Sequence, residues 1–292
     1  MTLQKINALI IGKSGQLARE LIDVMPSNIN AVALGKANID LFSRHDIENK
    51  ITNSKASVVI NASAYTAVDN AEDDKVNAYA LNEEAVINLA SICNHLKIRL
   101  IHISTDFVFD GQASTPYLPD NLPEPISIYG KSKLAGEKAI LNIAPEFGTI
   151  VRTSWLYSRH GNNFVKTMLN LMKSRDSLNI VCDQYGSPTC AKGLAEFIWD
   201  LSKQTKALPI YHWCDSGVTS WFDFAVSIQD YAFELGILNK KINIGPIPAS
   251  DYPTKAKRPL YSALNCTSSN KIKPQAKWQE SLKLMLNKLK EK

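Results

Sequence analysis

Short apolar runs alternate with longer helical segments over the first half of this 292-residue chain. The runs are rich in Val, Ile and Leu, and they occupy residues 7–11, 31–34, 57–60, 99–104 and 148–153. Helical spacing of apolar residues appears between them, notably in 16–25, 78–95 and 129–141. Strands that alternate with helices form right-handed β-α-β units around a parallel sheet. The pattern therefore predicts an α/β fold with a doubly wound sheet of the Rossmann type.

The pattern changes after residue 155. Turns rich in Pro, Gly and Ser, such as 185–193 and 244–259, separate shorter elements there. We expect residues 1–155 to form a dinucleotide-binding Rossmann domain, completed by segments around 178–212. Residues 156–292 should be mainly a smaller, C-terminal substrate-binding domain.

Composition excludes several classes of function. A formal charge of +5 without a block of Lys and Arg argues against a nucleic-acid partner. The apolar runs are far too short for a membrane span, and no signal peptide is recognisable. Five cysteines without a C-x-x-C pair predict neither a disulfide framework nor a zinc site, and they suit a reducing, cytoplasmic compartment.

A glycine turn joins the first strand to the first helix, in the sequence "LIIGKSGQLARE". Gly12 would allow the tight turn, and Gly15 would let the backbone approach a pyrophosphate at the helix N-terminus. The third glycine of the dinucleotide fingerprint is replaced by Ala18, whose methyl group still permits close packing. An ordinary strand–helix turn is the alternative interpretation.

The second strand ends without the acidic residue that normally binds the ribose 2′-hydroxyl of NAD. Lys36, helped by Lys13, could instead neutralise a 2′-phosphate, so we expect NADPH as cofactor, with NADH left open. The alternative is that Lys36 is a solvated loop lysine. Asp40 would either hydrogen-bond the adenine edge or cap the following helix.

Small and hydroxylated residues follow the next strands. Residues 61–64 are Asn-Ala-Ser-Ala, and Ser104, Thr105 and Asp106 end the strand that begins near residue 99. Because ligands of open α/β sheets lie outside the carboxyl ends of the strands, these loops should converge on one crevice.

Tyr129 and Lys133 lie four residues apart in "YGKSKLAGE", so they share one face of a helix. A Tyr followed four residues later by Lys or Arg is expected roughly once by chance in a chain with 10 Tyr and 33 Lys or Arg. The surrounding motifs must therefore decide whether this pair is catalytic. A phenol is a weak acid at neutral pH, and a nearby ammonium would lower its pKa. Thr105, or as second choice Ser104, would hydrogen-bond a carbonyl oxygen, while Tyr129 donates a proton to it.

With these motifs the chain resembles the extended short-chain dehydrogenase/reductases, and within them the dTDP-4-dehydrorhamnose reductases. The similarity covers residues 8 to about 264, and its motifs are "GKSGQLARE", "NASAYTAVDNAE", "STDFVFDG", "YGKSKLAGE", "VRTSWLYSRHGNNFVKTM", "DQYGSPT", "IYHWCDSGVTSWFDFA" and "RPLYSAL". It implies NADPH-dependent reduction of the 4-keto group of a nucleotide-linked sugar.

The resemblance also implies roles for single residues. The catalytic residues would be Thr105, Tyr129 and Lys133. The cofactor would be held by Gly12, Ser14, Gly15, Gln16, Leu17, Lys36, Asp40, Leu41, Ala62, Ala64, Tyr65 and Thr66, together with Tyr129 and Lys133. The substrate would be bound by Ser104, Thr105, Asp106, Trp155 and Arg258, although Trp155 could instead be a buried aromatic residue and Arg258 a surface arginine.

Departures from the family pattern bear on metals and assembly. Phe107 stands where the family often has Tyr. Some members bind magnesium through glutamates at a dimer contact; Glu20 fits one such position, but Lys192 occupies another. We therefore expect no metal and leave a homodimer open.

Two other functions remain open on the sequence. A reductase of another nucleotide-linked 4-keto sugar would use the same residues, because the product stereochemistry depends on how the sugar is placed. A cofactor-binding regulatory subunit without turnover, as in the β subunit of methionine adenosyltransferase, shares the fold and many motifs.

Overall fold

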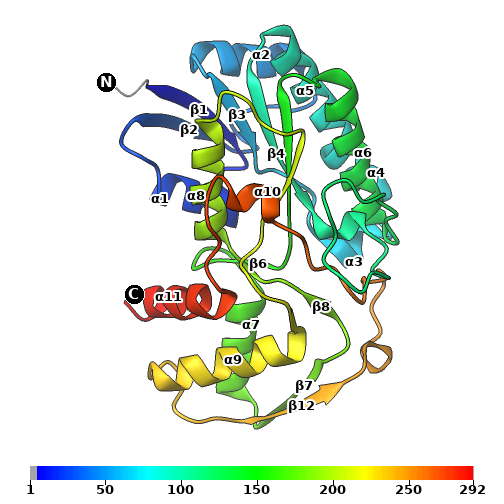
Figure 1. Ribbon diagram of the computed structural model, residues 1–292, viewed down its shortest axis with the longest axis vertical. Coiled ribbons are helices and arrows are strands. Elements are labelled where there is room, and N and C mark those ends of the chain that lie inside the picture. Colours follow the sequence, from blue (N-terminus) through cyan, green and yellow to red (C-terminus); the bar gives the residue numbers. More distant parts are fainter. Residues whose placement is uncertain (1–4, 292) are drawn as a thin grey trace.

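A six-stranded parallel sheet forms the centre of the upper region of the molecule in Figure 1. The structure is a computed structural model that describes residues 5–291. The strands run in the order β10-β5-β4-β3-β1-β2. Their bounds are β1 (Ile6–Ile11), β2 (Ile29–Leu34), β3 (Val58–Asn61), β4 (Arg99–Thr105), β5 (Gly148–Thr153) and β10 (Ile210–His212). The order reverses between β1 and β3, which is the place where open α/β sheets bind ligands.

Helices cover both faces of the sheet, and the side chains of β1 show why. Ala8 and Ile10 pack in one buried cluster with α1 and α8, whereas Leu9 and Ile11 pack in another with α2, α5 and α6. A strand covered on both faces is apolar at successive positions. The helices are α1 (Gln16–Asp23), α2 (Arg44–Asn53), α5 (Ala85–His95), α6 (Ile128–Ile143) and α8 (Ala191–Ser202). The predicted doubly wound α/β fold is confirmed.

The predicted strands agree with the observed ones to within two residues. The predicted helix 78–95 is interrupted: it consists of α4 (Lys75–Tyr79), a π-helical turn η1 (Ala80–Glu84) and then α5. Strand β10 pairs with β5. We expected segments around 178–212 to complete the Rossmann domain, but this strand was not predicted. Three residues are too few to carry a strand pattern, so β10 was not predictable as an element.

The C-terminal half has a hydrophobic cluster of its own, below the sheet in Figure 1. The cluster includes residues of three helices, α7, α9 and α11, and of the parallel pair β7–β12. These elements are α7 (Phe164–Ser174), β7 (Ser177–Val181), α9 (Trp221–Glu234), β12 (Asn243–Ile247) and α11 (Trp278–Lys290). The smaller elements are α3 (Val68–Ala71), η2 (Asp106–Val108), β6 (Leu156–Tyr157), β8 (Tyr185–Gly186), β9 (Thr189–Cys190), β11 (Thr219–Ser220), η3 (Ala249–Asp251) and α10 (Thr267–Asn270).

The chain passes between the two regions more than once. After α7 and β7 in the lower region, it returns to the sheet with α8 and β10 and then descends again to α9 (Figure 1). All five cysteines are free thiols. Among the helices described here, none combines the length and apolar character needed to cross a bilayer.

Candidate active site

A cavity of 1290 Å³ lies along the carboxyl ends of the central strands. Its lining comes from the loops after β1, β2, β3, β4 and β5 and from the start of α6. All fourteen residues expected to hold the cofactor line this cavity: Gly12, Ser14, Gly15, Gln16, Leu17, Lys36, Asp40, Leu41, Ala62, Ala64, Tyr65, Thr66, Tyr129 and Lys133. We call this cavity the main groove.

The glycine turn forms the floor of one end of the main groove. Gly12 has a φ of +107°, and a side chain there would lie 2.9 Å from the backbone of Ala62 and Ser63. Gly15 is the N-cap of α1 and has no side-chain cap, so backbone N–H groups of the first turn are free to face an anion. Ala18 is buried against the sheet, where its methyl group fits the core.

The loop after β2 places Lys36 and Asp40 on the main groove. The alternative that Asp40 caps the next helix is wrong. Helix α2 is capped by Ser43, whose side chain accepts a hydrogen bond from the Asp46 backbone. The Asp40 carboxylate instead accepts from the backbone of Phe42 at 2.9 Å, which shapes the loop itself.

Tyr129 and Lys133 both reach the main groove from α6, as their spacing predicts. The helix begins after Ser127, whose hydroxyl accepts from the Gly130 backbone and caps it. Burial raises the pKa of Tyr129 to about 12, whereas a hydrogen bond with Thr105 acts in the opposite direction. This differs from our expectation of a lowered pKa. At neutral pH Tyr129 is therefore a phenol, which is the form that donates a proton.

The two hydroxyls at the end of β4 have different partners. Ser104 donates to the buried carboxylate of Glu137, which is paired with Arg152 at 2.7 Å. Thr105 lies next to Tyr129 and donates to Asp106 at 3.1 Å. Because Ser104 contacts the buried Glu137 whereas Thr105 lies beside Tyr129, the arrangement favours Thr105 as the hydroxyl that would meet a substrate carbonyl.

A π-helical turn holds α6 in place. Asn82 of η1 donates to the hydroxyl of Ser132 at 2.9 Å, and Ser132 in turn donates to the backbone oxygen of Tyr129 at 2.8 Å. The amide of Asn82 also exchanges hydrogen bonds with the backbone of Tyr65, on the rim of the main groove. Isolated π-turns inside helices often mark functional sites.

The main groove also receives residues that the sequence analysis did not assign. Gly161 and Asn162, from the loop before α7, line it, and a Cβ atom at Gly161 would lie 3.0 Å from the Gln16 side chain. Asn163 donates to the side chain of Gln16 at 2.8 Å and so ties this loop to α1. The "GNN" turn in the chain was the available signal, but nothing local indicated that it would fold back onto residues 147 positions earlier.

Trp155 lines the main groove and lies next to a residue of a second cavity of 1030 Å³. Its indole stacks on Trp221 with the ring centroids 3.5 Å apart, and Trp221 lines the second cavity. Trp155 has a φ of +46°, an uncommon conformation for a bulky residue, and it is only partly buried. The alternative that Trp155 is simply a buried aromatic residue is thus not favoured.

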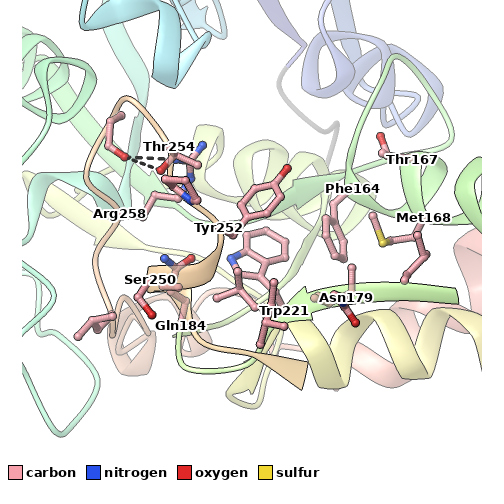
Figure 2. A pocket seen from close by; sticks show the side chains of 18 of the residues that line it. Phe164, Thr167, Met168, Asn179, Gln184, Trp221, Ser250, Tyr252, Thr254 and Arg258 are labelled. Atoms are coloured by element: carbon pink, nitrogen blue, oxygen red, sulfur yellow. Dashed lines mark hydrogen bonds between the residues drawn. The ribbon is translucent and has the colours of Figure 1, made fainter. Parts of the chain in front are cut away.

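Figure 2 shows the second cavity, which opens between α7, β7 and the loop around η3. Aromatic side chains of Phe164, Trp221 and Tyr252 line it together with Arg258. Arg258 is not a free surface arginine: it pairs with Asp69 of α3 at 2.7 Å. Of the substrate residues expected from the sequence, Arg258 lines this second cavity, while Ser104, Thr105, Asp106 and Trp155 line the main groove.

One acidic cluster lies outside both cavities, where the loop after β6 meets α1. Ligand atoms of Glu20, Asp23 and His160 lie within 4.8 Å of one another. One oxygen of Asp23 already contacts Arg159 at 2.6 Å and His160 at 2.5 Å. A divalent cation would have to displace a guanidinium there, so these residues do not fit a metal site. Lys192, which occupies the second position where some family members have a metal-binding glutamate, forms an ion pair with Glu196.

A family model described as RmlD substrate binding domain matches residues 6–291. The dTDP-4-dehydrorhamnose reductase of Aggregatibacter actinomycetemcomitans is 38% identical over 94% of this chain and 96% of its own length. The crystal structure of dTDP-4-dehydrorhamnose reductase from Bacillus anthracis in complex with NADP has a TM-score of 0.91 and 33% identity, covering 97% of this chain and 99% of that one.

The relatives also include a protein with a different substrate in its name. The dTDP-4-keto-6-deoxy-D-glucose reductase of Streptomyces niveus is 33% identical over 88% of this chain and 87% of its own length. The resemblance inferred from the motifs is nevertheless confirmed by the family match along nearly the whole chain. The chain belongs to the dTDP-4-dehydrorhamnose reductase family.

Proposed function

We propose that this protein reduces the 4-keto group of dTDP-4-dehydro-L-rhamnose to give dTDP-L-rhamnose, with NADPH as the reductant. The observation that carries the proposal is the meeting of Thr105, Tyr129 and Lys133 in the groove that begins at the glycine turn. These residues come from β4 and α6, and the turn comes from the other side of the switch point. Membership of the reductase family supports the same chemistry.

The three residues would divide the work as follows. The hydroxyl of Thr105 hydrogen-bonds the C4 carbonyl oxygen and polarises it. Bound NADPH supplies the hydride for C4. Tyr129 gives its phenolic proton to the oxygen as negative charge develops there. In its protonated form, Lys133 stabilises the resulting phenolate and helps to hold the cofactor.

The tyrosine assignment is tested by Tyr129→Phe, which removes the proton donor and leaves the ring. Turnover should fall by on the order of 10²-fold or more, because a positioned acid contributes about that much. The affinity for NADPH, measured by fluorescence titration, should change little. A variant with near-normal turnover would remove Tyr129 from the mechanism.

For the cofactor we propose that Lys36 contacts the 2′-phosphate of NADPH at the end of β2. Lys36→Ala should raise the KM for NADPH about tenfold, as expected for one lost charge-assisted contact, and leave the KM for NADH nearly unchanged. Lys5→Ala removes a lysine at the opposite end of the sheet and serves as the control. A clear preference for NADH that survives in Lys36→Ala would contradict the assignment.

For the substrate we propose that the sugar lies between Trp155 and Thr105, with Ser104 and Asp106 shaping that end of the groove. The nucleotide would extend into the second cavity, where Arg258 could reach its diphosphate after leaving Asp69. In this proposal residues 1–155 bind the cofactor together with α8 and β10 of the 178–212 segment, whereas β7 at the start of that segment lines the second cavity and belongs with the rest of the chain to the nucleotide-binding part. Five free thiols suit a cytoplasmic reaction.

Product identification separates this function from its nearest rival. The name of the Streptomyces niveus relative favours keeping a second candidate, the reduction of another dTDP-linked 4-keto sugar. Incubation with a panel of such sugars and NADPH, followed by NMR of the products, should give the L-rhamno configuration. If NADPH binds tightly but no sugar is reduced, the protein is a regulatory cofactor-binding subunit instead.

A further inference from the structure

Asn61, His102 and Lys133 form a chain of buried side chains directly behind the main groove. Asn61 ends β3, and His102 is its register partner on β4. The amide nitrogen Nδ2 of Asn61 lies 3.0 Å from His102 Nδ1, and His102 Nε2 lies 3.1 Å from Lys133 Nζ. Each of the three side chains is at most 1% exposed, so water does not complete these hydrogen bonds.

The orientation of the Asn61 amide is determined by Ser63. Its oxygen Oδ1 accepts from the backbone N–H of Ser63 at 3.1 Å and from the Ser63 hydroxyl at 2.7 Å. A backbone N–H can only donate, so an amide turned the other way would lose this bond and place two donors together. The nitrogen Nδ2 must therefore donate to His102 Nδ1.

This donor decides the tautomer of His102. Burial holds the pKa of His102 well below its ordinary value, and the charge of Lys133 acts in the same direction, so the ring is neutral. A neutral imidazole has one donor and one acceptor nitrogen. Since Nδ1 accepts from Asn61, the proton is on Nε2, and it points toward Lys133 Nζ.

An Nε2–H group that faces Nζ needs a lone pair on that nitrogen. A lysine amine has one, and it can still donate to the backbone oxygen of Ile103 at 2.8 Å. A lysine ammonium has none, because all its positions are donors. Protonating Lys133 thus forces two donors together either at Nε2 or, if the ring proton moves, at Asn61.

We propose that Asn61 and His102 are positioning residues for the reductase proposed above, and that their hydrogen-bond chain favours the amine form of Lys133 over the ammonium form. The chain acts through Lys133 and touches neither substrate nor cofactor in this proposal. Its consequence is that Lys133 gains and loses a proton near neutral pH instead of being a permanent cation. The activity should then be sensitive to pH in that range.

Other groups around Lys133 act on the same equilibrium. Burial lowers the pKa of Lys133 to about 8, and Glu137, one turn further along α6, acts to raise it. Glu137 is paired with Arg152 of β5, which offsets part of its charge. From η2, Asp106 faces Tyr129 rather than Lys133. Of these groups only His102 presents a hydrogen-bond donor to Nζ.

The first experiment reads the tautomer directly and requires no turnover. In protein with ¹⁵N-labelled histidine, the His102 ring signals are assigned by their loss in His102→Leu. We expect the Nε2–H tautomer in the natural chain. In Asn61→Asp a carboxylate oxygen would accept from Nδ1–H while the other oxygen keeps the Ser63 contacts, so the tautomer should invert. An Nδ1–H tautomer or an imidazolium in the natural chain would overturn the proposal.

The second experiment measures the titration of Lys133 by NMR of ¹³C-labelled lysine side chains, with the signal assigned through Lys133→Met. In Asn61→Asp the midpoint should rise by at least about one pH unit, since one unit corresponds to roughly the value of one hydrogen bond. Asn88→Asp, which adds a carboxylate beside Arg44 of the same domain, is the matched control and should leave the midpoint unchanged.

A double variant separates the hydrogen-bond chain from a simple charge effect. When His102→Leu is combined with Asn61→Asp, the new carboxylate can act on Lys133 only through space. The rise in the midpoint should then shrink to less than half. If the midpoint rose equally with and without His102, the proposal would be overturned, because the effect of Asn61→Asp would not depend on the hydrogen bonds through His102.

The kinetic consequence links the inference to the proposed reaction. The alkaline fall of kcat for sugar reduction should move to higher pH in Asn61→Asp, in step with the Lys133 midpoint, while the KM for NADPH changes less. If no sugar of the panel is reduced, the proposed function fails, but the two NMR results still decide the tautomer and the titration. If the Lys133 midpoint rose in Asn61→Asp while the alkaline fall of kcat stayed at the same pH, the hydrogen bonds would set the titration of Lys133 but would have no role in the reaction.

Discussion

Asp215 places a carboxyl group in the interior, and within residues 5–291 no cationic side chain forms an ion pair with it. One of its oxygens accepts from the Cys190 backbone at 2.9 Å, at the N-terminus of α8. Burial raises the pKa of Asp215 to about 7, although the hydrogen bond from Cys190 acts to lower it. The folded protein therefore binds a proton that the unfolded chain, with an ordinary carboxyl, releases above about pH 4.

The sign of the resulting pH dependence follows from proton linkage. Between about pH 4 and pH 7 the folded state binds more protons at Asp215 than the unfolded state, so this group makes the protein less stable as pH rises. Asp215→Asn keeps an oxygen for the Cys190 N–H but does not titrate. From pH 5 to pH 8 the free energy of unfolding of the variant, relative to the natural chain, should improve by on the order of 2 kcal/mol.

Urea denaturation at several pH values measures this difference. Asp176→Asn is the control. Asp176 is exposed and pairs with Lys240, which lowers the pKa of Asp176. This carboxyl therefore changes the stability only at pH values below the range tested. Parallel stability curves for Asp215→Asn and the natural chain would show that Asp215 is ionised in the folded protein throughout.

At the scale of elements, α6 matters most because it carries both Tyr129 and Lys133. Its contact with the π-helical turn η1 is so close that no side chain fits at Gly136. A Cβ atom there would lie 2.1 Å from the backbone oxygen of Asn82. The glycine therefore sets the distance between α6 and the segment that follows β3.

Gly136→Ala tests this packing. Alanine favours a helix over glycine by about 1 kcal/mol, but the overlap with Asn82 is with backbone and requires an element to shift. We expect a net loss of about 2 kcal/mol in the free energy of unfolding, together with a lower kcat because Tyr129 moves with α6. The loss should appear as a lower midpoint in thermal or denaturant unfolding.

Gly193→Ala is the matched control within a helix. Its Cβ would make only ordinary contacts, the nearest being 3.5 Å from Asp215, so the protein should become up to about 1 kcal/mol more stable. If both alanine variants changed stability in the same direction, the close approach of α6 to η1 would not be the reason.

The strands of the sheet and the shared helical face of Tyr129 and Lys133 could be predicted because both depend on local sequence patterns. β-branched runs between helical segments predicted the central strands, and the four-residue spacing placed Tyr129 and Lys133 on one face. The positions of Ser104 and Thr105 followed from the strand ends. What distinguishes the two hydroxyls, the contact of Ser104 with Glu137, depends on a helix 33 residues away and was not predictable.

At the scale of the molecule, the contacts that complete the site join distant parts of the chain. Arg258 meets Asp69 across 189 positions, and neither residue carries a local sign of the other. The pair of Asn163 with Gln16 is of the same kind. Motif order identified the family, but such pairings follow from the relative placement of the two regions, which periodicity does not encode.

The loop between β6 and α7 is another contact between distant parts of the chain, because its residues line the main groove. Asp23 at the end of α1 holds this loop through Arg159 and His160, and the loop brings Gly161 and Asn162 onto the groove. The two partners of Asp23 lower its pKa against the effect of burial, so the anchor is an ionised carboxylate at neutral pH.

Asp23→Asn keeps the size of the side chain and removes its charge, so the loop should leave the glycine turn more readily. Because the anchor is about 30% exposed, its charge is partly screened, and the expected effect is modest. The Kd for NADPH should rise roughly three- to tenfold by fluorescence titration, whereas kcat at saturating NADPH should stay the same, since Tyr129 lies on another element. Asp230→Asn on α9, which breaks a surface ion pair with Lys241, should leave the Kd unchanged. An unchanged Kd in Asp23→Asn would mean that Asn163 and Gln16 alone hold the loop in place, and a fall in kcat would mean that the loop also orients the reacting groups.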